Sequence, residues 1–183
     1  MYGLVNKAIE GLICSQAGEG VWAQVKQKAG IEENYFVSMN PYPDEVSYKL
    51  VGAASEVLGL SAEEVLIQFG EYWVLYTAQE GYGNLLAMTG HDFRGFLFNL
   101  DNMHAQVGLG FPELKPPSFR VTENSPEELT LHYYSDRAGL SPMVIGLLHG
   151  LGKLMNTSVH VKQTAHHAQG ADHDEFLVQY RPI

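Results

Sequence analysis

The sequence is poor in several features that would each point to a class of function. Its single cysteine, Cys14, cannot form an internal disulfide, so we expect a reduced, cytoplasmic protein. A formal net charge of −10, with no basic cluster, disfavours nucleic acid and anionic membranes as partners. No apolar run approaches the roughly 20 residues that cross a bilayer, and the N-terminus lacks a signal-peptide pattern, so we expect no membrane insertion.

The motifs of common enzymes are also missing. The chain contains no Walker loop, no His-Glu-x-x-His, no Gly-x-Ser-x-Gly and no Gly-x-Gly-x-x-Gly. The paired acids Glu63-Glu64 and Glu127-Glu128 fit a helix start and a turn, where such charges are solvated. The segment Ser61-Ala62-Glu63-Glu64 is a capping-box signature for the helix expected over 62–77. We therefore expect a protein that binds a ligand or a partner rather than an enzyme.

What the sequence does contain is enough apolar surface for a packed core. Of its 183 residues, 45% are hydrophobic and 11% are aromatic. Hydrophobic periodicity and turn residues predict an α+β fold, in which a helical N-terminal lobe leads into a four-stranded antiparallel sheet crossed by one helix. The expected helices span residues 3–15, 19–29, 44–58, 62–77, 84–89, 92–107 and 142–154, and the expected strands span 118–124, 128–135, 157–165 and 174–180.

One predicted strand carries an arginine on its buried face, where an unpaired charge is unfavourable. Alternate residues of a strand share a face, so Leu129 and Leu131 set a buried side that Tyr133, Ser135 and Arg137 continue if the strand persists. A buried guanidinium needs an anion, and two hydroxyls with a guanidinium form a donor set for carboxylates. Alternatively, the strand ends near Tyr133 and Arg137 is solvated or pairs with a nearby acid.

The second unusual residue is a histidine on the apolar face of a helix. His104 lies four residues after Leu100 and three before Val107, on the stripe that faces the core. A single inward histidine is usually structural, but imidazole is also the commonest metal ligand and one axial histidine is enough for haem. Haem has two anionic propionates and large apolar faces, so this one ligand accounts for both His104 and Arg137.

Together these residues resemble the H-NOX (haem nitric oxide/oxygen binding) domains. These domains occur as small bacterial gas sensors and at the start of the β subunit of animal soluble guanylate cyclase. The resemblance covers essentially the whole chain, and its most specific element is Tyr-x-Ser-x-Arg at residues 133–137. Further matching segments are Met1-Tyr2-Gly3-Leu4-Val5-Asn6, Phe69-Gly70, Leu100-Asp101-Asn102-Met103-His104, Lys115-Pro116-Pro117-Ser118-Phe119 and Gly139-Leu140. The resemblance implies one haem domain over residues 1–183, with a helical subdomain 1–60, a haem-bearing subdomain 61–183 and the haem between the two lobes.

The resemblance also implies roles on the proximal and propionate sides of the haem. His104 would be the proximal ligand of the iron in haem b, which is iron protoporphyrin IX. Tyr133, Ser135 and Arg137 would bind the propionates. Asp44 falls where some relatives carry an acid that pairs with the motif arginine, although an acid near a helix start is usually a cap.

On the remaining sides, the resemblance implies that Pro117 presses on the porphyrin and that Leu4 packs near the distal face. Oxygen-binding relatives carry a distal tyrosine where this chain has Met143, which offers no hydrogen-bond donor. This departure favours binding of NO and CO and only weak or no binding of O₂. Trp73 would lie on the distal side, where its indole N–H could donate, although packing is the commoner role of such a tryptophan.

A mechanism follows partly from chemistry and partly from the resemblance. NO on ferrous haem weakens the bond opposite it, so loss of the iron–His104 bond would release the 92–107 helix and let the haem relax against Pro117. The lobes would then shift, and a partner that prefers one arrangement would respond. Because 183 residues leave no room for an output domain, we expect a separate effector, typically a histidine kinase or a cyclic-dinucleotide enzyme in bacterial relatives.

Other interpretations stay open at this point. The chain could be an oxygen-binding haem sensor or, less in keeping with the matched distal residues, a haem enzyme. The C-terminal histidines His160, His166, His167 and His173 could gather around a metal, although loop histidines are mostly solvated. A partner-binding scaffold without a cofactor is the last alternative, and a colourless purified protein would identify it.

Overall fold

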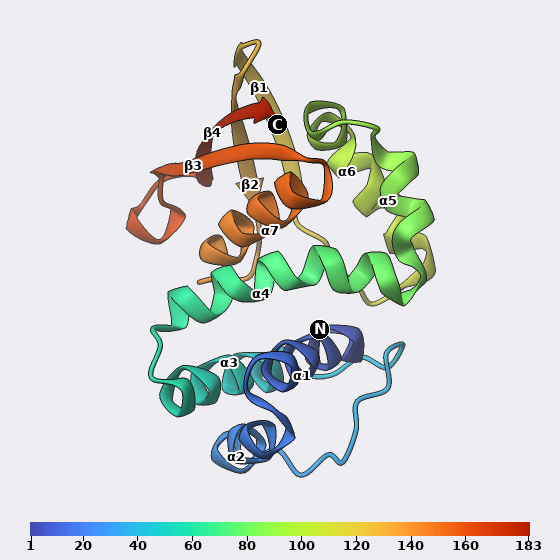
Figure 1. The fold of residues 1–183 in the computed structure, drawn as a ribbon, viewed down its shortest axis with the longest axis vertical. Helices are drawn as coiled ribbons and strands as arrows, with labels where there is room; N and C mark the ends of the chain where they lie inside the picture. Colours follow the sequence, from blue (N-terminus) through green and yellow to red (C-terminus); the bar gives the residue numbers. More distant parts are fainter.

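The computed structural model describes residues 1–183, except for the side chains of residues 78 and 79. Three helices form a layer at one end of the molecule, the sheet forms the other end, and α4 runs between them (Figure 1). The α-helices are α1 (Gly3–Ala17), α2 (Glu19–Ala29), α3 (Asp44–Leu58), α4 (Ala62–Thr77), α5 (Gly83–Thr89), α6 (Phe93–Gly110) and α7 (Ser141–Leu154). The strands are β1 (Ser118–Ser125), β2 (Glu128–Tyr134), β3 (Thr157–Ala165) and β4 (Asp174–Pro182). The α+β prediction is therefore confirmed.

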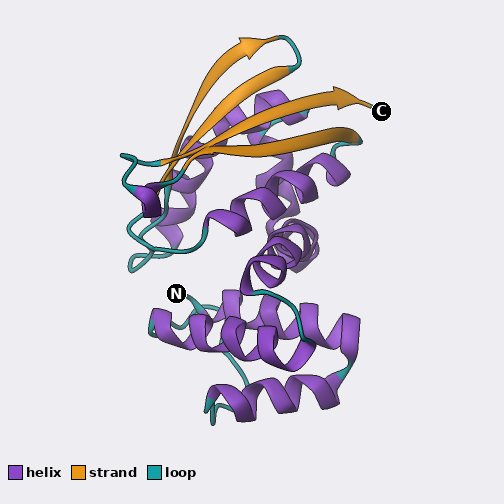
Figure 2. Cartoon of the chain, turned by 90° about the vertical axis from the view of Figure 1, so that its left-hand side faces the viewer, coloured by secondary structure: helices purple, strands orange, loops and turns teal.

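The sheet is antiparallel throughout and has the strand order β1-β2-β4-β3. Helices lie against one of its faces (Figure 2). The inward residues of β2, Leu129 and Leu131, are almost fully buried, and so is Phe176 of β4. Apolar residues of α6 and α7 pack against these strands and complete the second core. The first core lies among α1, α2, α3 and one side of α4.

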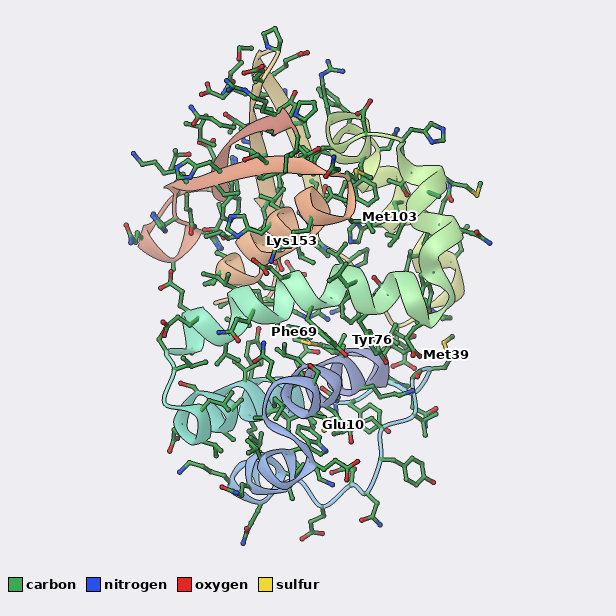
Figure 3. The ribbon with its side chains drawn as sticks, in the orientation of Figure 1. Glu10, Met39, Phe69, Tyr76, Met103 and Lys153 are labelled. Carbon is green, nitrogen blue, oxygen red and sulfur yellow. The ribbon has the colours of Figure 1, made fainter. Side chains whose placement is uncertain are left out.

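Helix α4 contacts both cores. Its Phe69 and Tyr76 point toward α1 (Figure 3), and Phe69 is buried in the first core. On its other side, α4 crosses α7 at very short range. A Cβ atom on Gly70 would lie 2.2 Å from the Met143 carbonyl oxygen, and one on Gly146 would lie 2.0 Å from the Ile67 carbonyl oxygen. The crossing therefore requires glycine at both positions. The expected division into subdomains 1–60 and 61–183 stays a prediction.

Several helix ends follow from local chemistry. The predicted capping box at α4 forms, because Ser61 Oγ accepts from the Glu64 amide at 3.1 Å and Glu64 Oε2 accepts from the Ser61 amide at 2.8 Å. Asp92 caps α6 by accepting from the Gly95 amide at 2.6 Å. Among the helices of the described residues, none has the length and apolar character that crossing a membrane requires.

Several predicted ends differ from the structure by one to three residues, and two of them have a clear physical cause. The helix expected to stop at Gly108 continues to Gly110, because a glycine in a helix is only about 1 kcal/mol worse than alanine and the first proline follows at Pro112. The strand expected to reach residue 135 ends at Tyr134. Beyond it, the Arg137 amide donates to Ser135 Oγ at 3.1 Å, and this local turn replaces the extended geometry.

Candidate functional site

A large cavity lies between the N-terminal end of α1, the C-terminal end of α4, and the lobe that contains α6, α7 and the sheet. Its volume is about 320 Å³, within the range of small-molecule sites, and most of its wall is apolar. The loop after α6 and the loop after β2 close two of its sides. The structure brings all eight predicted site residues to this cavity, namely Leu4, Trp73, His104, Pro117, Tyr133, Ser135, Arg137 and Met143.

His104 lies on the α6 wall of the cavity. Its Nδ1 is 2.9 Å from the Leu100 carbonyl oxygen, one turn earlier in the helix. This hydrogen bond fixes the ring and assigns the proton to Nδ1, so Nε2 is the nitrogen with a lone pair for a metal. The ring packs on Phe119, with 5.3 Å between the ring centroids. Burial lowers the pKa of His104, which favours the neutral imidazole that metals bind.

Helix α6 is held against β1 at two points that precede His104 in the chain. Asp101 Oδ1 accepts from Ser118 Oγ at 3.0 Å and from the Phe119 amide at 2.9 Å. Near the start of the helix, Arg94 binds both carboxylate oxygens of Glu123, at 3.2 and 2.7 Å. The position of His104 is therefore coupled to the sheet through α6.

The predicted donor set gathers at one end of the cavity, although not in the way that we expected. Tyr133 is buried on the inner face of β2, but Ser135 and Arg137 lie in the loop beyond the strand. A turn rather than strand alternation thus brings the three side chains together. Burial raises the pKa of Tyr133, and a hydrogen bond with Ser135 offsets only part of this effect. The phenol therefore stays protonated and can donate.

Arg137 pairs with an acid, as one of our two interpretations supposed. Its Nε donates to Asp44 Oδ2 at 2.7 Å and its Nη1 donates to the Lys115 carbonyl oxygen at 2.7 Å. Asp44 also binds the α-ammonium group of Met1. Burial alone would raise the pKa of Asp44, but its hydrogen bonds to the ammonium group and to Arg137 outweigh burial and lower it. Arg137 Nη2 makes no hydrogen bond with any side chain that the structure describes.

The wall made by α1, α4 and α7 is mainly apolar. Leu4 and Met143 lie there, and neither offers a hydrogen-bond donor. Trp73 both lines the cavity and packs on Phe69, with 6.0 Å between the ring centroids. The sequence interpretation missed Tyr82, which also lines the cavity. Tyr82 lies between two glycines, where the pattern indicated only a break between helices, so no sequence signal pointed to it.

The C-terminal histidines do not gather as one alternative supposed. His160 and His167 are exposed. Within the part of the chain whose side chains are described, one group of three metal-ligating residues occurs, and it consists of His132, His173 and Glu175. Only His173 belongs to the set that we considered from the sequence.

The fold and the cavity define a class of protein, namely a two-lobed α+β domain whose large apolar cavity combines a histidine that can bind a metal with a donor set that can bind anionic groups. The family model described as Haem-NO-binding (HNOB) matches residues 2–163. The chain belongs to this haem-binding family.

Relatives by sequence are animal cyclases. Soluble guanylate cyclase gcy-31 of Caenorhabditis elegans is 32% identical over 160 residues, which make up 87% of this chain and 23% of that protein. Soluble guanylate cyclase 89Db of Drosophila melanogaster is 28% identical over 153 residues, or 84% of this chain and 23% of that protein. The chain spans about a quarter of the length of these relatives, so their cyclase activity is not transferred to it.

Solved structures of the same fold are bacterial H-NOX proteins. The protein from S. oneidensis in its Fe(II)NO ligation state has a TM-score of 0.89 at 20% identity, with 99% of both chains covered. The unliganded Fe(II) protein from K. algicida has a TM-score of 0.86 at 22% identity, and the match covers 100% of this chain and 98% of that one. These matches establish the fold.

Proposed function

We propose that the chain is a haem-based gas sensor that binds NO and CO at ferrous haem b and passes a conformational change to a separate signalling partner. Membership of the haem-binding family supports the cofactor. The observation that carries the proposal is the pairing of features in one cavity. His104 presents Nε2 from one wall, and Tyr133, Ser135 and Arg137 stand together at one end.

The residues of the cavity fit the chemistry of haem. His104 would be the axial ligand, and the hydrogen bond to the Leu100 carbonyl would orient it. Tyr133, Ser135 and Arg137 would neutralise the propionates, with the free Nη2 of Arg137 as one donor. Pro117, at the cavity wall, would press on the macrocycle. The haem itself would supply the iron at which a diatomic gas binds.

Selectivity for NO over O₂ rests on the wall opposite His104. Bound O₂ carries partial negative charge and needs a hydrogen-bond donor more than NO does, and Leu4 and Met143 offer none. Two residues favour the oxygen-binding alternative, because the indole of Trp73 and the phenol of Tyr82 both line the cavity. We give NO the preference because Trp73 also packs on Phe69 and Tyr76.

The signal would leave the site along α6. His104 is fixed to α6, and the segment after this helix contacts the N-terminal lobe. The rings of Tyr2 and Phe111 pack in a T-shaped arrangement with 4.8 Å between their centroids, and the Tyr2 hydroxyl accepts from the Glu113 amide at 3.1 Å. A movement of α6 would therefore reach the first residues of α1 directly.

Two further contacts join the lobes at the other side of the cavity. These are the Arg137–Asp44 ion pair and the hydrogen bond from the Tyr48 hydroxyl to the Ala138 carbonyl oxygen at 3.0 Å. Both involve the loop that carries the donor set. A change at either end of the site would thus alter the relative position of the lobes, which a partner that binds both would sense.

For the partner, we propose a separate cytoplasmic protein, such as the histidine kinases and cyclic-dinucleotide enzymes of bacterial signalling. The free Cys14 is in keeping with a reducing compartment.

The proposal is tested with purified protein supplied with haem. We expect one haem per chain, binding of NO and CO to the reduced protein, and no long-lived oxygen complex in air. Tyr82→Phe and Trp73→Phe serve as matched variants, because each removes one potential donor and keeps an aromatic ring. A stable oxygen complex that disappears in either variant would replace the NO assignment by the oxygen-binding alternative. Failure to retain haem would overturn the proposal as a whole.

A further inference from the structure

A second group of ligating side chains lies on the outer face of the sheet, away from the cavity. His132 of β2 and Glu175 of β4 are direct cross-strand partners, so their side chains project from the same face. His173, from the segment just before β4, joins them. All three side chains are partly shielded, with exposed fractions of 16% for His132, 15% for His173 and 33% for Glu175.

The three side chains direct one atom each to a common point. His132 Nδ1 lies 2.8 Å from His173 Nε2 and 3.2 Å from Glu175 Oε1, and His173 Nε2 lies 3.3 Å from Glu175 Oε1. Ligand atoms around a tetrahedral Zn²⁺ with bonds of about 2.0–2.1 Å stand about 3.3 Å apart. The triangle is therefore close in size to one face of a zinc coordination shell.

Each histidine is oriented from behind by a second partner. The outer nitrogen of His132, Nε2, lies 3.0 Å from the Thr122 hydroxyl oxygen. The outer nitrogen of His173, Nδ1, lies 3.1 Å from Asp172 Oδ2, and the ring stacks on Tyr134 with 4.3 Å between centroids. A metal-binding histidine commonly donates its remote N–H to a carboxylate in this way, which fixes the tautomer and the ring.

The protons available on His132 and His173 indicate that a cation lies between the three facing atoms. If His173 donates from Nδ1 to Asp172, its Nε2 presents a lone pair to Glu175 Oε1, which presents another. If the Thr122 hydroxyl donates to His132 Nε2, the proton of His132 is on Nδ1. This single proton cannot form a full hydrogen bond with both His173 Nε2 and Glu175 Oε1. A metal ion satisfies all three atoms at once.

We propose that His132, His173 and Glu175 bind a divalent transition-metal ion, for which Zn²⁺ is the best match. Two imidazoles and one carboxylate suit Zn²⁺ better than Ca²⁺ or Mg²⁺, which prefer oxygen ligands. Water would take the fourth position on the exposed side of Glu175. The ion would connect the segment before β4 to β2. The site lies on the outer face of the sheet, next to the point where Tyr133 of β2 pairs with Asp174 of β4.

The test measures zinc in haem-loaded protein that has been stripped with a chelator and then dialysed against Zn²⁺. We expect about one equivalent of zinc per chain, and a rise in the melting temperature on zinc addition. His173→Gln and Glu175→Gln should each weaken zinc binding at least about tenfold and abolish the thermal shift. His160→Gln is the matched control, because it removes an exposed histidine from β3 of the same hairpin.

Two results would overturn the inference. One is the absence of retained zinc in the wild-type protein, and the other is equal zinc retention in all of the variants, which would place the ion elsewhere. If His173→Gln does not fold, Glu175→Gln decides the question, because it keeps the shape of the side chain and removes only the charge. The result is independent of the proposed gas sensing, because the haem spectrum is recorded separately on the same samples.

Discussion

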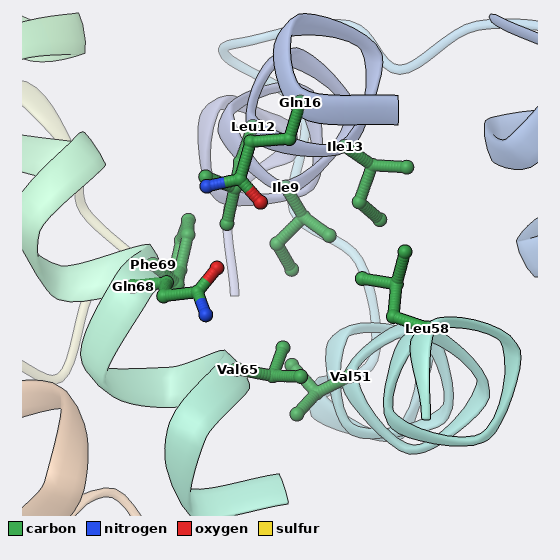
Figure 4. A pocket seen from close by; sticks show the side chains of 9 residues that line it. All are labelled: Ile9, Leu12, Ile13, Gln16, Val51, Leu58, Val65, Gln68 and Phe69. Atoms are coloured by element: carbon green, nitrogen blue, oxygen red, sulfur yellow. The ribbon is translucent and has the colours of Figure 1, made fainter. Parts of the chain in front are cut away.

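Two cavities in this protein differ in what their walls contain. The smaller one lies in the N-terminal lobe among α1, α3 and α4, and its volume of about 10 Å³ is close to the minimum for one water molecule (Figure 4). Its wall is aliphatic and aromatic apart from Gln16 and Gln68. The larger cavity, of about 320 Å³, combines apolar walls with His104 and the Tyr133–Arg137 donor set.

The comparison shows how a binding site differs from a packing gap. Protein cores are packed densely, and a void of about one water volume is what imperfect packing leaves. A void thirty times larger would collapse unless a ligand filled it or its walls were held apart. Here the walls are held by the Asp101 and Arg94 contacts of α6 and by the ion pair of Arg137 with Asp44. The four predictions below alter one of the two cavities or a contact that holds the walls of the larger one apart.

The largest effect is expected from His104→Gly, which removes the only proposed bond between the cofactor iron and the protein. Haem retention should fall at least about tenfold, since loss even of outer-sphere partners weakens metal binding tenfold or more. Any partner control by NO should disappear even where haem remains. Added imidazole should restore retention, because it fills the space left by the side chain. Unchanged control of a partner by NO in this variant would contradict the proposed route through α6.

The second prediction changes the apolar wall. Met143→Tyr places a phenol where this chain has no donor, and a hydrogen bond to bound O₂ should contribute about 1.4 kcal/mol. Oxygen should then leave the reduced protein about tenfold more slowly, as stopped-flow absorbance would measure. Met143→Phe is the control for side-chain size. If both variants release oxygen at the same rate, the wall at residue 143 does not face the bound gas.

The third prediction concerns the ion pair that joins the lobes. Asp44→Asn should lower the free energy of unfolding by about 1 kcal/mol at pH 7, because the pair is charge-assisted but partly exposed. The pKa of Asp44 is lowered in the folded protein, so its contribution is present above the usual value near 3.8 and is lost as the pH falls through the folded-state pKa. The difference between wild type and variant in urea unfolding should thus shrink below pH 4 or so.

Glu45→Gln serves as the control for that experiment, because Glu45 is an exposed neighbour in the same helical turn. Equal effects of the two substitutions would mean that the contact with Arg137 adds nothing beyond a general charge effect.

The smallest effect is expected in the other cavity. Val65→Ile adds one methylene beside the small gap and should raise the free energy of unfolding by no more than about 0.8 kcal/mol. Haem content and gas binding should not change, because Val65 belongs to the first core and does not line the large cavity. Calorimetry and the haem spectrum measure the two quantities on one sample. A loss of haem would show that the cavities are coupled.

The sequence was sufficient for the order and type of the elements, because each depends on local patterns. The capping box at Ser61 and the alternation of Leu129 and Leu131 are examples, and both form as expected. The residues that line the cavity were predicted chiefly from the family resemblance. Spacing alone left the role of His104 open, since an inward histidine on a helix has the same pattern whether it packs or binds a metal.

What the sequence did not predict depends on geometry between distant segments. The turn at Ser135 ended β2 early, because a side chain to backbone hydrogen bond competed with strand pairing. Tyr82 reached the cavity through the path of the chain around Gly81, which has a φ of +96°. The cross-strand register that places His132 opposite Glu175 could not be derived from a pattern of single residues.

The most direct test of the central claim is the optical spectrum of the purified, reduced protein before and after NO is added without oxygen. We predict a five-coordinate, histidine-ligated ferrous haem that becomes a nitrosyl form without the histidine. This result would support His104 both as the ligand and as the group through which the gas acts. A protein with no haem band, even after haem is supplied, would contradict the account and leave the cavity to another ligand.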